Sequence, residues 1–272
     1  MKPTRPTRTN AASTWLEVLV IIVVVFLLWL VMHGMVSARN RAYRIRCNNY
    51  LKQVGLAARI WSNDHGERFP WTVSTNQGGT LEYASSAEVY RHFVVMSNEL
   101  TTPFVLKCLS DTRRISAKSF SSLANENISY FIGLDADEDR PQTILSGDRN
   151  ITGGVTNGNW FLFGSNALPG WDSTIHDHVG NIGLGDGSVQ QFTPNLLAQQ
   201  FQSALRSMTN NGPIRLAVPR VPEDEAEPDG IIFGIDVPVP LVTAVLIGVG
   251  LLVGWWFVRR RFVTEPLKDP NP

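Results

Sequence analysis

The segment HDHVGNIGLGDGSVQQF, residues 176–192, concentrates the side chains best suited to chemistry. Imidazole nitrogens and carboxylate oxygens are metal ligands, and the same groups act as general acids and bases. His176, Asp177, His178 and Asp186 could therefore form a metal or acid–base site. The alternative is that two short strands meet at the Asp-Gly dipeptide, with no chemistry involved. The choice between the two decides whether the protein is an enzyme.

The residues around the dipeptide favour a hairpin. Asp186-Gly187 is a strong signal for a two-residue type I′ turn, because both central positions of that turn need a positive φ. A metal site needs three or four converging ligands, whereas Asp186 is used in the turn. No His-Glu-x-x-His, Cys-x-x-Cys or Gly-x-Ser-x-Gly motif occurs in the sequence. We therefore predict a signature hairpin of His176, Asp186 and Gly187 without catalytic residues, in which His176 could hydrogen-bond across the hairpin and fix its register.

A second acidic segment has the opening of a calcium-binding loop, with Asp135, Asp137 and Asp139 at alternate positions. Such a loop needs glycine at its sixth position and glutamate at its twelfth, where this chain has Arg140 and Ser146. A solvated turn is the preferred interpretation, and calcium is the alternative. No other cofactor is expected.

Cys47 and Cys108 are the two cysteines of the chain. Two cysteines in an oxidising compartment often form a disulfide, and this one would fasten a helix to the domain beside it. Two buried thiols are the alternative, and the sequence leaves both readings open.

The composition points to a membrane and away from nucleic acid. The chain of 272 residues has no formal net charge, whereas nucleic-acid-binding proteins carry a basic excess. Apolar residues gather in two runs, Trp15–Met32 and Val239–Val258, and a helix of about 18 residues spans roughly 27 Å, close to the hydrocarbon thickness of a bilayer. Acidic residues precede the second run and arginines follow it, which places both termini in the cytoplasm. We therefore predict two transmembrane helices in a lipid bilayer, although a buried core helix, or a signal peptide at the first run, would also be apolar.

The first run is expected to continue as a helix, since no proline occurs between Thr14 and Phe69. Beyond the span, apolar residues recur four and three positions apart, which predicts an amphipathic helix with one face on a folded domain. This apolar stripe consists of Cys47, Leu51, Val54, Ala58 and Trp61. Further along, the segments FVLKCL, ISYFIGL, TILSG and NWFLFG are expected to be strands, whereas VYRHFVVM and residues 194–208 are expected to be helices.

The start of the apolar run, ASTWLEVLV, resembles the N-terminus of type IV pilins and type II secretion pseudopilins. In that family a prepilin peptidase cuts after a glycine, and a glutamate at the fifth mature position aligns subunits in the filament. The resemblance implies cleavage between Ala12 and Ser13, with Ala12 in place of the family's glycine. It also implies an assembly role for Glu17.

Four further segments narrow the resemblance to bacterial pseudopilin-like proteins of the H-x9-D-G class. They are CNNYLKQVGLAARIWSNDHGERFP, KCLSDTRR, SYFIGLDADEDRPQTILSGDRN and the stretch from His176 to Asp186-Gly187. The resemblance implies an α+β, pilin-like fold in which a long N-terminal transmembrane and stalk helix packs on an antiparallel sheet. It also implies other pseudopilins or secretion and pilus assembly proteins as partners. With the two apolar runs, it predicts a bacterial inner-membrane protein with a periplasmic central domain.

The expected organisation has seven parts. These are a basic leader-like segment (1–13), a transmembrane helix (14–36), an amphipathic stalk helix (37–65), a pilin-like α+β domain (66–216), an acidic proline-rich tether (217–237), a second transmembrane helix (238–258) and a basic tail (259–272). The predicted function is that of a membrane-anchored, non-catalytic structural or assembly component related to type II secretion and type IV pili. The alternative is a glycan- or calcium-binding module on a pilin-type stalk, and an enzyme ranks third.

Overall fold

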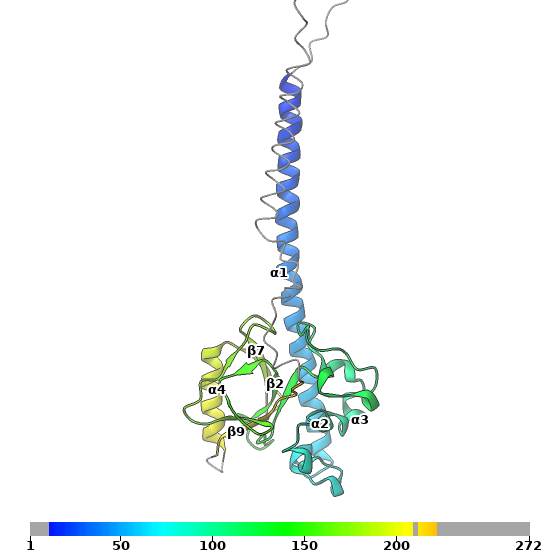
Figure 1. Ribbon diagram of the computed structural model, residues 1–272, viewed down its shortest axis with the longest axis vertical. Helices are drawn as coiled ribbons and strands as arrows, with labels where there is room; N and C mark the ends of the chain where they lie inside the picture. The colour runs from blue at the N-terminus through cyan, green and yellow to red at the C-terminus, as the bar shows by residue number, and fades with distance from the viewer. Residues whose placement is uncertain (1–10, 209–211, 222–272) are drawn as a thin grey trace, which may run out of the picture. The chain divides into compact units, whose positions relative to one another are not determined.

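The structure is a computed structural model that describes residues 11–208 and 212–221 (Figure 1). The chain divides into two compact units, residues 1–222 and 223–272, and the second lies outside the described residues. The second predicted transmembrane helix, the basic tail and most of the predicted tether therefore also lie outside them.

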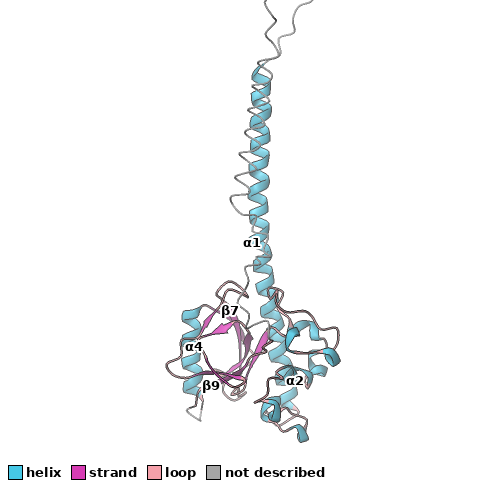
Figure 2. Cartoon of the chain, viewed as in Figure 1, coloured by secondary structure: helices cyan, strands magenta, loops and turns pink. Residues whose placement is uncertain are grey.

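The first unit is organised by an antiparallel sheet of seven strands in the order β4-β5-β9-β1-β2-β7-β8. The strands are magenta in Figure 2. Each strand pairs with its neighbours in antiparallel register. A separate two-stranded sheet joins β3 to β6. The strands are β1 (Tyr130–Gly133), β2 (Ile144–Asp148), β3 (Ile151–Thr152), β4 (Val155–Asn157), β5 (Trp160–Phe163), β6 (Gly170–Trp171), β7 (Gly180–Leu184), β8 (Val189–Phe192) and β9 (Ile214–Ala217).

Helices cover both faces of the sheet (Figure 1). The C-terminal part of α1 (Ala11–Asn63) packs on β2, β7 and β8, whereas α4 (Pro194–Ser207) contacts β8 and β9. Side chains alternate between the two layers because successive residues of a strand point to opposite faces. In β1, Tyr130 and Ile132 join the core beneath α1, while Phe131 joins the core beneath α4.

The apolar stripe predicted on α1 is buried in the first of these cores. Its five members, Cys47, Leu51, Val54, Ala58 and Trp61, are each at most 4% exposed. The helix ends at Asn63, and Gly66 follows with a φ of 71°, a conformation that glycine adopts without strain.

The segment between α1 and the sheet consists of short helices, and one of them corrects a sequence prediction. FVLKCL was expected to be a strand, but Pro103–Leu106 forms a 3-10 helix. Pro103 favours the first helical position, and the Thr102 hydroxyl accepts a hydrogen bond from the backbone N–H of Phe104. The helices of this kind are α2 (Tyr90–Val94), α3 (Ser97–Leu100), η1 (Pro70–Thr72), η2 (Thr75–Gln77), η3 (Leu81–Tyr83), η4 (Pro103–Leu106), η5 (Phe120–Ser122) and η6 (Asn125–Asn127).

The predicted pilin-like fold class, a transmembrane and stalk helix on a sheet with a second transmembrane helix, is wrong. In the described part of the chain, no helix combines the length and apolarity needed to cross a bilayer. The same finding overturns the predicted two-span inner-membrane location with cytoplasmic termini and a periplasmic domain. The domain is built around the antiparallel sheet, because the short β-branched and aromatic segments after residue 130 pair with one another. Apolar runs alone are a weaker guide to the architecture than those segments.

Candidate functional site

The signature hairpin is formed by β7 and β8, with a turn that differs from the predicted one. Gly183 pairs with Val189, and the backbone N–H of Leu184 donates to the carbonyl of Ser188 at 2.9 Å, which leaves a loop of three residues. Gly187 has a φ of 82°, and its N–H donates to the Leu184 carbonyl at 2.8 Å. A β-turn followed by one left-handed residue is the usual form of a three-residue hairpin loop. The predicted two-residue type I′ turn is therefore wrong, since Gly187 alone supplies the positive φ.

The other end of the signature is a strained turn. His176, Asp177 and His178 have φ values of 60°, 55° and 59°, so three successive residues with side chains are left-handed. Each such residue costs on the order of 1–3 kcal/mol unless its surroundings hold it there. The turn buries the side chain of His176 completely and leaves Asp177 and His178 exposed.

The imidazole of His176 points at a disulfide and a carboxylate. Its Nε2 lies 3.3 Å from Cys108 Sγ and 3.7 Å from Asp148 Oδ2, whereas Nδ1 has no hydrogen-bond partner among the described residues. Burial lowers the pKa of His176 to about 4, and the positive charge of Arg44 acts in the same direction. The predicted hydrogen bond from His176 across the hairpin is absent from the hydrogen bonds of the described residues.

Cys47 and Cys108 form a disulfide with their Cα atoms 5.1 Å apart. Cys47 belongs to the buried face of α1, and Cys108 follows η4, so the bond joins the helix to the segment before the sheet. Both residues are fully buried. Of the two readings that the sequence leaves open, the structure has the disulfide.

Asp148 lies beside the disulfide at the end of β2 and is fully buried. Its Oδ2 accepts hydrogen bonds from the backbone N–H and the side-chain Nδ2 of Asn181, at 2.7 and 2.9 Å, but Oδ1 has no partner within the described part of the chain. Burial raises the pKa of Asp148 to about 7, against the opposing effect of the two hydrogen bonds from Asn181. The carboxyl group of Asp148 therefore titrates close to neutral pH.

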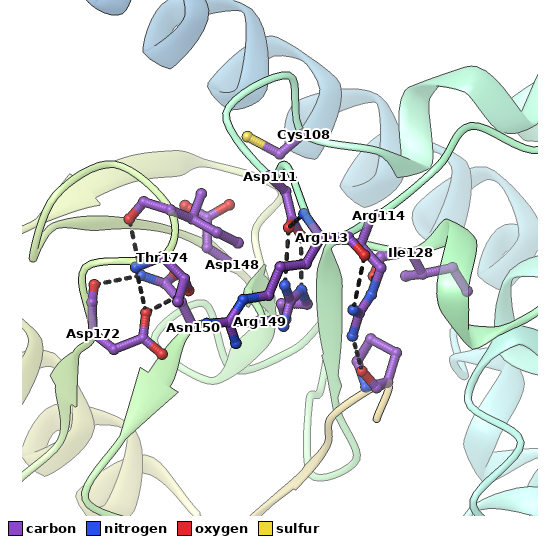
Figure 3. Close-up of polar contacts among 12 residues, drawn as sticks. Cys108, Asp111, Arg113, Arg114, Ile128, Asp148, Arg149, Asn150, Asp172 and Thr174 are labelled. Carbon is purple, nitrogen blue, oxygen red and sulfur yellow. Dashed lines mark hydrogen bonds and ion pairs between the residues drawn. The ribbon is translucent and has the colours of Figure 1, made fainter. Parts of the chain in front are cut away.

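The neighbouring residue, Arg149, forms a buried ion pair with Asp111 (Figure 3). Arg149 Nε donates to Asp111 Oδ2 at 2.7 Å, and Nη2 donates to Oδ1 at 2.9 Å. The side chains of Asp111 and Arg149 are 0% and 7% exposed. Bidentate geometry of this kind fixes the relative orientation of the two segments as well as neutralising both charges.

Asn150, two residues after the end of β2, is hydrogen-bonded to the segment before the strained turn. Its Nδ2 donates to the carbonyls of Asp172 and Ile175, each at 3.0 Å, immediately before His176 (Figure 3). The run Asp148-Arg149-Asn150 thus contacts three different segments. Segments widely separated in the sequence meet here as one buried polar cluster, made of Cys47, Cys108, Asp111, Asp148, Arg149, Asn150, His176 and Asn181.

The cluster does not have the arrangement of a nucleophilic relay. In a Cys-His-Asp relay, the carboxylate binds the imidazole nitrogen opposite the one that faces the nucleophile. Here Nε2 of His176 faces both Cys108 and Asp148, and the Cys108 sulfur is already bonded to Cys47. What the cluster supplies is a set of donor atoms and a rigid connection between α1 and the sheet.

The calcium candidates lie elsewhere, on a cleft of about 480 Å³. Asp135 is bound by Arg215, whose Nη2 lies 2.6 Å from Asp135 Oδ1, and Asp137 pairs with Arg140 at 3.4 Å. Asp137 Oδ1 also accepts from the backbone N–H of Asp139. In the part of the chain that the structure describes, Cys47, Cys108 and His176 are the group of three potential metal ligands, and the three aspartates are not.

The remaining predicted residues lie far along the sequence from the cluster. Ala12, Ser13 and Glu17 all belong to α1, and the side chain of Glu17 is exposed. Sequence reasoning missed five residues of the cluster, namely Asp111, Asp148, Arg149, Asn150 and Asn181. The segment LSGDRN could have indicated part of the cluster. It places an acidic and a basic residue, Asp148 and Arg149, at the end of an apolar strand, and buried charged side chains need partners.

Comparison with protein-family models, with curated proteins and with solved structures finds no match to this chain.

Proposed function

We propose that the protein is a non-catalytic, pseudopilin-like structural or assembly component that associates through the N-terminal half of α1. The observation that carries this proposal is the run from Leu19 to Val31, in which every residue is large, apolar and exposed. The exposed fraction of these side chains ranges from 39% at Trp29 to 63% at Ile22. The C-terminal part of the same helix packs on the sheet, whereas the side chains of this run are exposed.

The exposed run is much larger than an incidental apolar patch. Soluble monomers rarely expose contiguous apolar surface beyond a few hundred Å² (about 300–600 Å² for the largest patch), and larger surfaces mark interaction sites. A helix that is apolar on all sides is normally buried by several neighbours. Helices of other subunits would supply those neighbours, and the resemblance at Glu17 supports the same arrangement. We therefore favour side-by-side association of α1 helices, with Glu17 aligning the subunits.

A second candidate function, a ligand-binding module, is favoured by the cleft of about 480 Å³. Its lining includes Glu67, Arg68 and Asp139, so both signs of charge face one opening. Polar clefts of this size accommodate small polar ligands such as a glycan. Calcium is the weaker ligand here, because arginines already bind the carboxylates of Asp135 and Asp137.

Cross-linking of the full chain tests the association of α1. An added cysteine at Val24→Cys should give disulfide-linked dimers on mild oxidation, because Val24 lies within the exposed apolar run. Gln199→Cys, at an exposed position of α4, is the matched control and should stay monomeric. Adding Leu27→Glu to Val24→Cys should abolish the dimers, because a buried unpaired charge is costly.

Equal cross-linking at both positions, or none at Val24→Cys, would rule out association through this run. Protein that stays uncross-linked but floats with phospholipid vesicles would show that the run meets lipid and not other helices, which also contradicts the proposal.

A further inference from the structure

In the oxidised protein, the contacts of the His176 ring are too weak to offset the backbone strain that places it there. Three left-handed residues hold the ring in place, yet among the described residues its polar contacts are a disulfide sulfur, which is a weak acceptor, and Asp148 at 3.7 Å. His176 Nδ1 and Asp148 Oδ1 are both buried without a hydrogen-bond partner in the described residues. Strain of this kind persists at functional positions.

The donor atoms gathered here match the ligands of a zinc ion. The sulfurs of Cys47 and Cys108 and a ring nitrogen of His176 all lie within 4.8 Å of one another. Asp148 adds a carboxylate oxygen 3.7 Å from His176 Nε2. Two sulfurs, one nitrogen and one oxygen make a four-coordinate set of donor types that Zn²⁺ accepts, and the site is closed to solvent, as structural zinc sites are.

The spacing of the donors also fits. With Zn–S near 2.3 Å and Zn–N and Zn–O near 2.0–2.2 Å, tetrahedral geometry places neighbouring ligand atoms roughly 3.4–3.8 Å apart. The observed separations from His176 Nε2 are 3.3 Å to Cys108 Sγ and 3.7 Å to Asp148 Oδ2. The two sulfurs must move apart, which rotation of the Cys47 and Cys108 side chains can provide once their bond is broken. The carboxylate of Asp148, which lies outside the group within 4.8 Å, must turn toward them.

We propose that the reduced protein binds one Zn²⁺ through Cys47, Cys108, His176 and Asp148, so that this position of the fold holds either a disulfide or a zinc ion. A dithiol reductant supplies two electrons and two protons, which convert the disulfide into two thiols while the reductant itself becomes a disulfide. Zinc then binds as both thiols release their protons to solvent, because the thiolate is the ligand. Either occupant links α1 to the segment before the sheet, and zinc additionally engages the strained His176.

The test uses the full chain reduced with a phosphine, which does not compete strongly for metal, and freed of metal by a chelator that is then removed. Titration with Co²⁺ should show one equivalent bound, with thiolate-to-cobalt charge-transfer absorption and the visible bands of a tetrahedral site. Zn²⁺ should bleach these bands, and oxidised protein should show none of them.

Three variants separate the site from adventitious binding to free cysteines. His176→Ala and Asp148→Asn should each weaken Co²⁺ binding by at least about tenfold, the effect seen even for residues that only support ligands. His178→Ala is the matched control, because His178 lies in the same turn but is exposed, and it should bind as the wild type does.

Circular dichroism of the reduced protein shows whether it remains folded, so that a failure to bind metal can be told apart from unfolding. Reduced protein that is folded but takes up no stoichiometric Co²⁺ overturns the proposal, as does undiminished binding by both His176→Ala and Asp148→Asn. If reduction unfolds the protein, restoration of the fold by Zn²⁺ supports the proposal, and failure of Zn²⁺ to restore it overturns the proposal.

Discussion

Removal of the disulfide should strongly destabilise the fold. The bond joins residues 61 positions apart, and the loop-entropy relation for that length gives about 4 kcal/mol of stabilisation at 25 °C. A domain of this size is stable by roughly 5–15 kcal/mol in total. The double variant Cys47→Ala/Cys108→Ala should therefore lose a large part of its free energy of unfolding. Loss of two buried sulfur atoms adds a packing cost in the same direction.

Urea titration followed by tryptophan fluorescence measures this loss. Trp61 and Trp71 are 4% and 2% exposed, so unfolding moves both indoles from the core into water. The slope of the free energy against urea should rise slightly, because the unfolded chain without the bond exposes more surface. Wild-type protein reduced in the presence of a chelator separates the loss of the bond from the loss of the sulfurs. A difference of less than about 1 kcal/mol between the double variant and the oxidised wild type would refute the loop-entropy reasoning.

Two further predictions concern buried charges. Arg149→Met should lower the free energy of unfolding by about 3–5 kcal/mol, because it leaves the carboxylate of Asp111 buried without its partner. The double variant Asp111→Asn/Arg149→Met should recover part of that loss in the same urea assay. An equal loss in both variants would contradict this reasoning. His92 is buried, and its Nδ1 lies 2.7 Å from the Thr80 hydroxyl. Burial lowers the pKa of His92 from 6.5 to about 4. The contribution of neutral His92 to stability is therefore complete above pH 6.5 and is lost as the pH falls to about 4. That loss amounts to about 3 kcal/mol. The free energy of unfolding of His92→Gln should be less dependent on pH by this amount, whereas identical pH profiles would show that folding does not lower the pKa of His92.

Local patterns predicted the elements of the fold better than their assembly. The stripe from Cys47 to Trp61 predicted the buried face of α1, because helical periodicity is a local property. Three of the four segments expected to be strands overlap β1, β2 and β5, whereas FVLKCL is helical because Pro103 and Thr102 favour a 3-10 turn. The order of the strands was beyond sequence reasoning, since β9 lies between β5 and β1 although it comes last in the chain.

In the candidate site, even fewer contacts between distant residues could be predicted from the sequence. Cys47 and Cys108 could be singled out by residue type, but the partners of the buried charges could not. Asp111 and Arg149 are separated by 38 residues, and Asn181 and Asp148 by 33, so no periodicity or motif connects them. Burial forces these groups together only after the sheet has formed. The left-handed turn at His176 was also hidden, because histidine and aspartate carry no strong local preference for three such residues in succession.

The spacing of nine residues between His176 and Asp186 has a structural explanation in the distance between two contacts on α1. His176 lies against the disulfide of Cys47, while Nη1 of Arg59 donates to the Asp186 carbonyl at 2.7 Å. Twelve helical residues separate Cys47 from Arg59, which is about 18 Å along the axis, and a strand of about six residues, such as β7 with its first loop residue, covers roughly the same length.

Two further contacts show that β7 and the helix run side by side in the same direction. A side chain at Gly183 would lie 3.8 Å from Leu51, in the middle of the helical segment, and one at Gly55 would lie 3.9 Å from Gly187, near its end. The strand therefore runs alongside the helix and is fastened to it at each end, by the disulfide cluster and by Arg59. A fixed number of residues between histidine and the Asp-Gly turn is what such a double attachment requires, because one added residue would turn every following side chain of β7 to the opposite face.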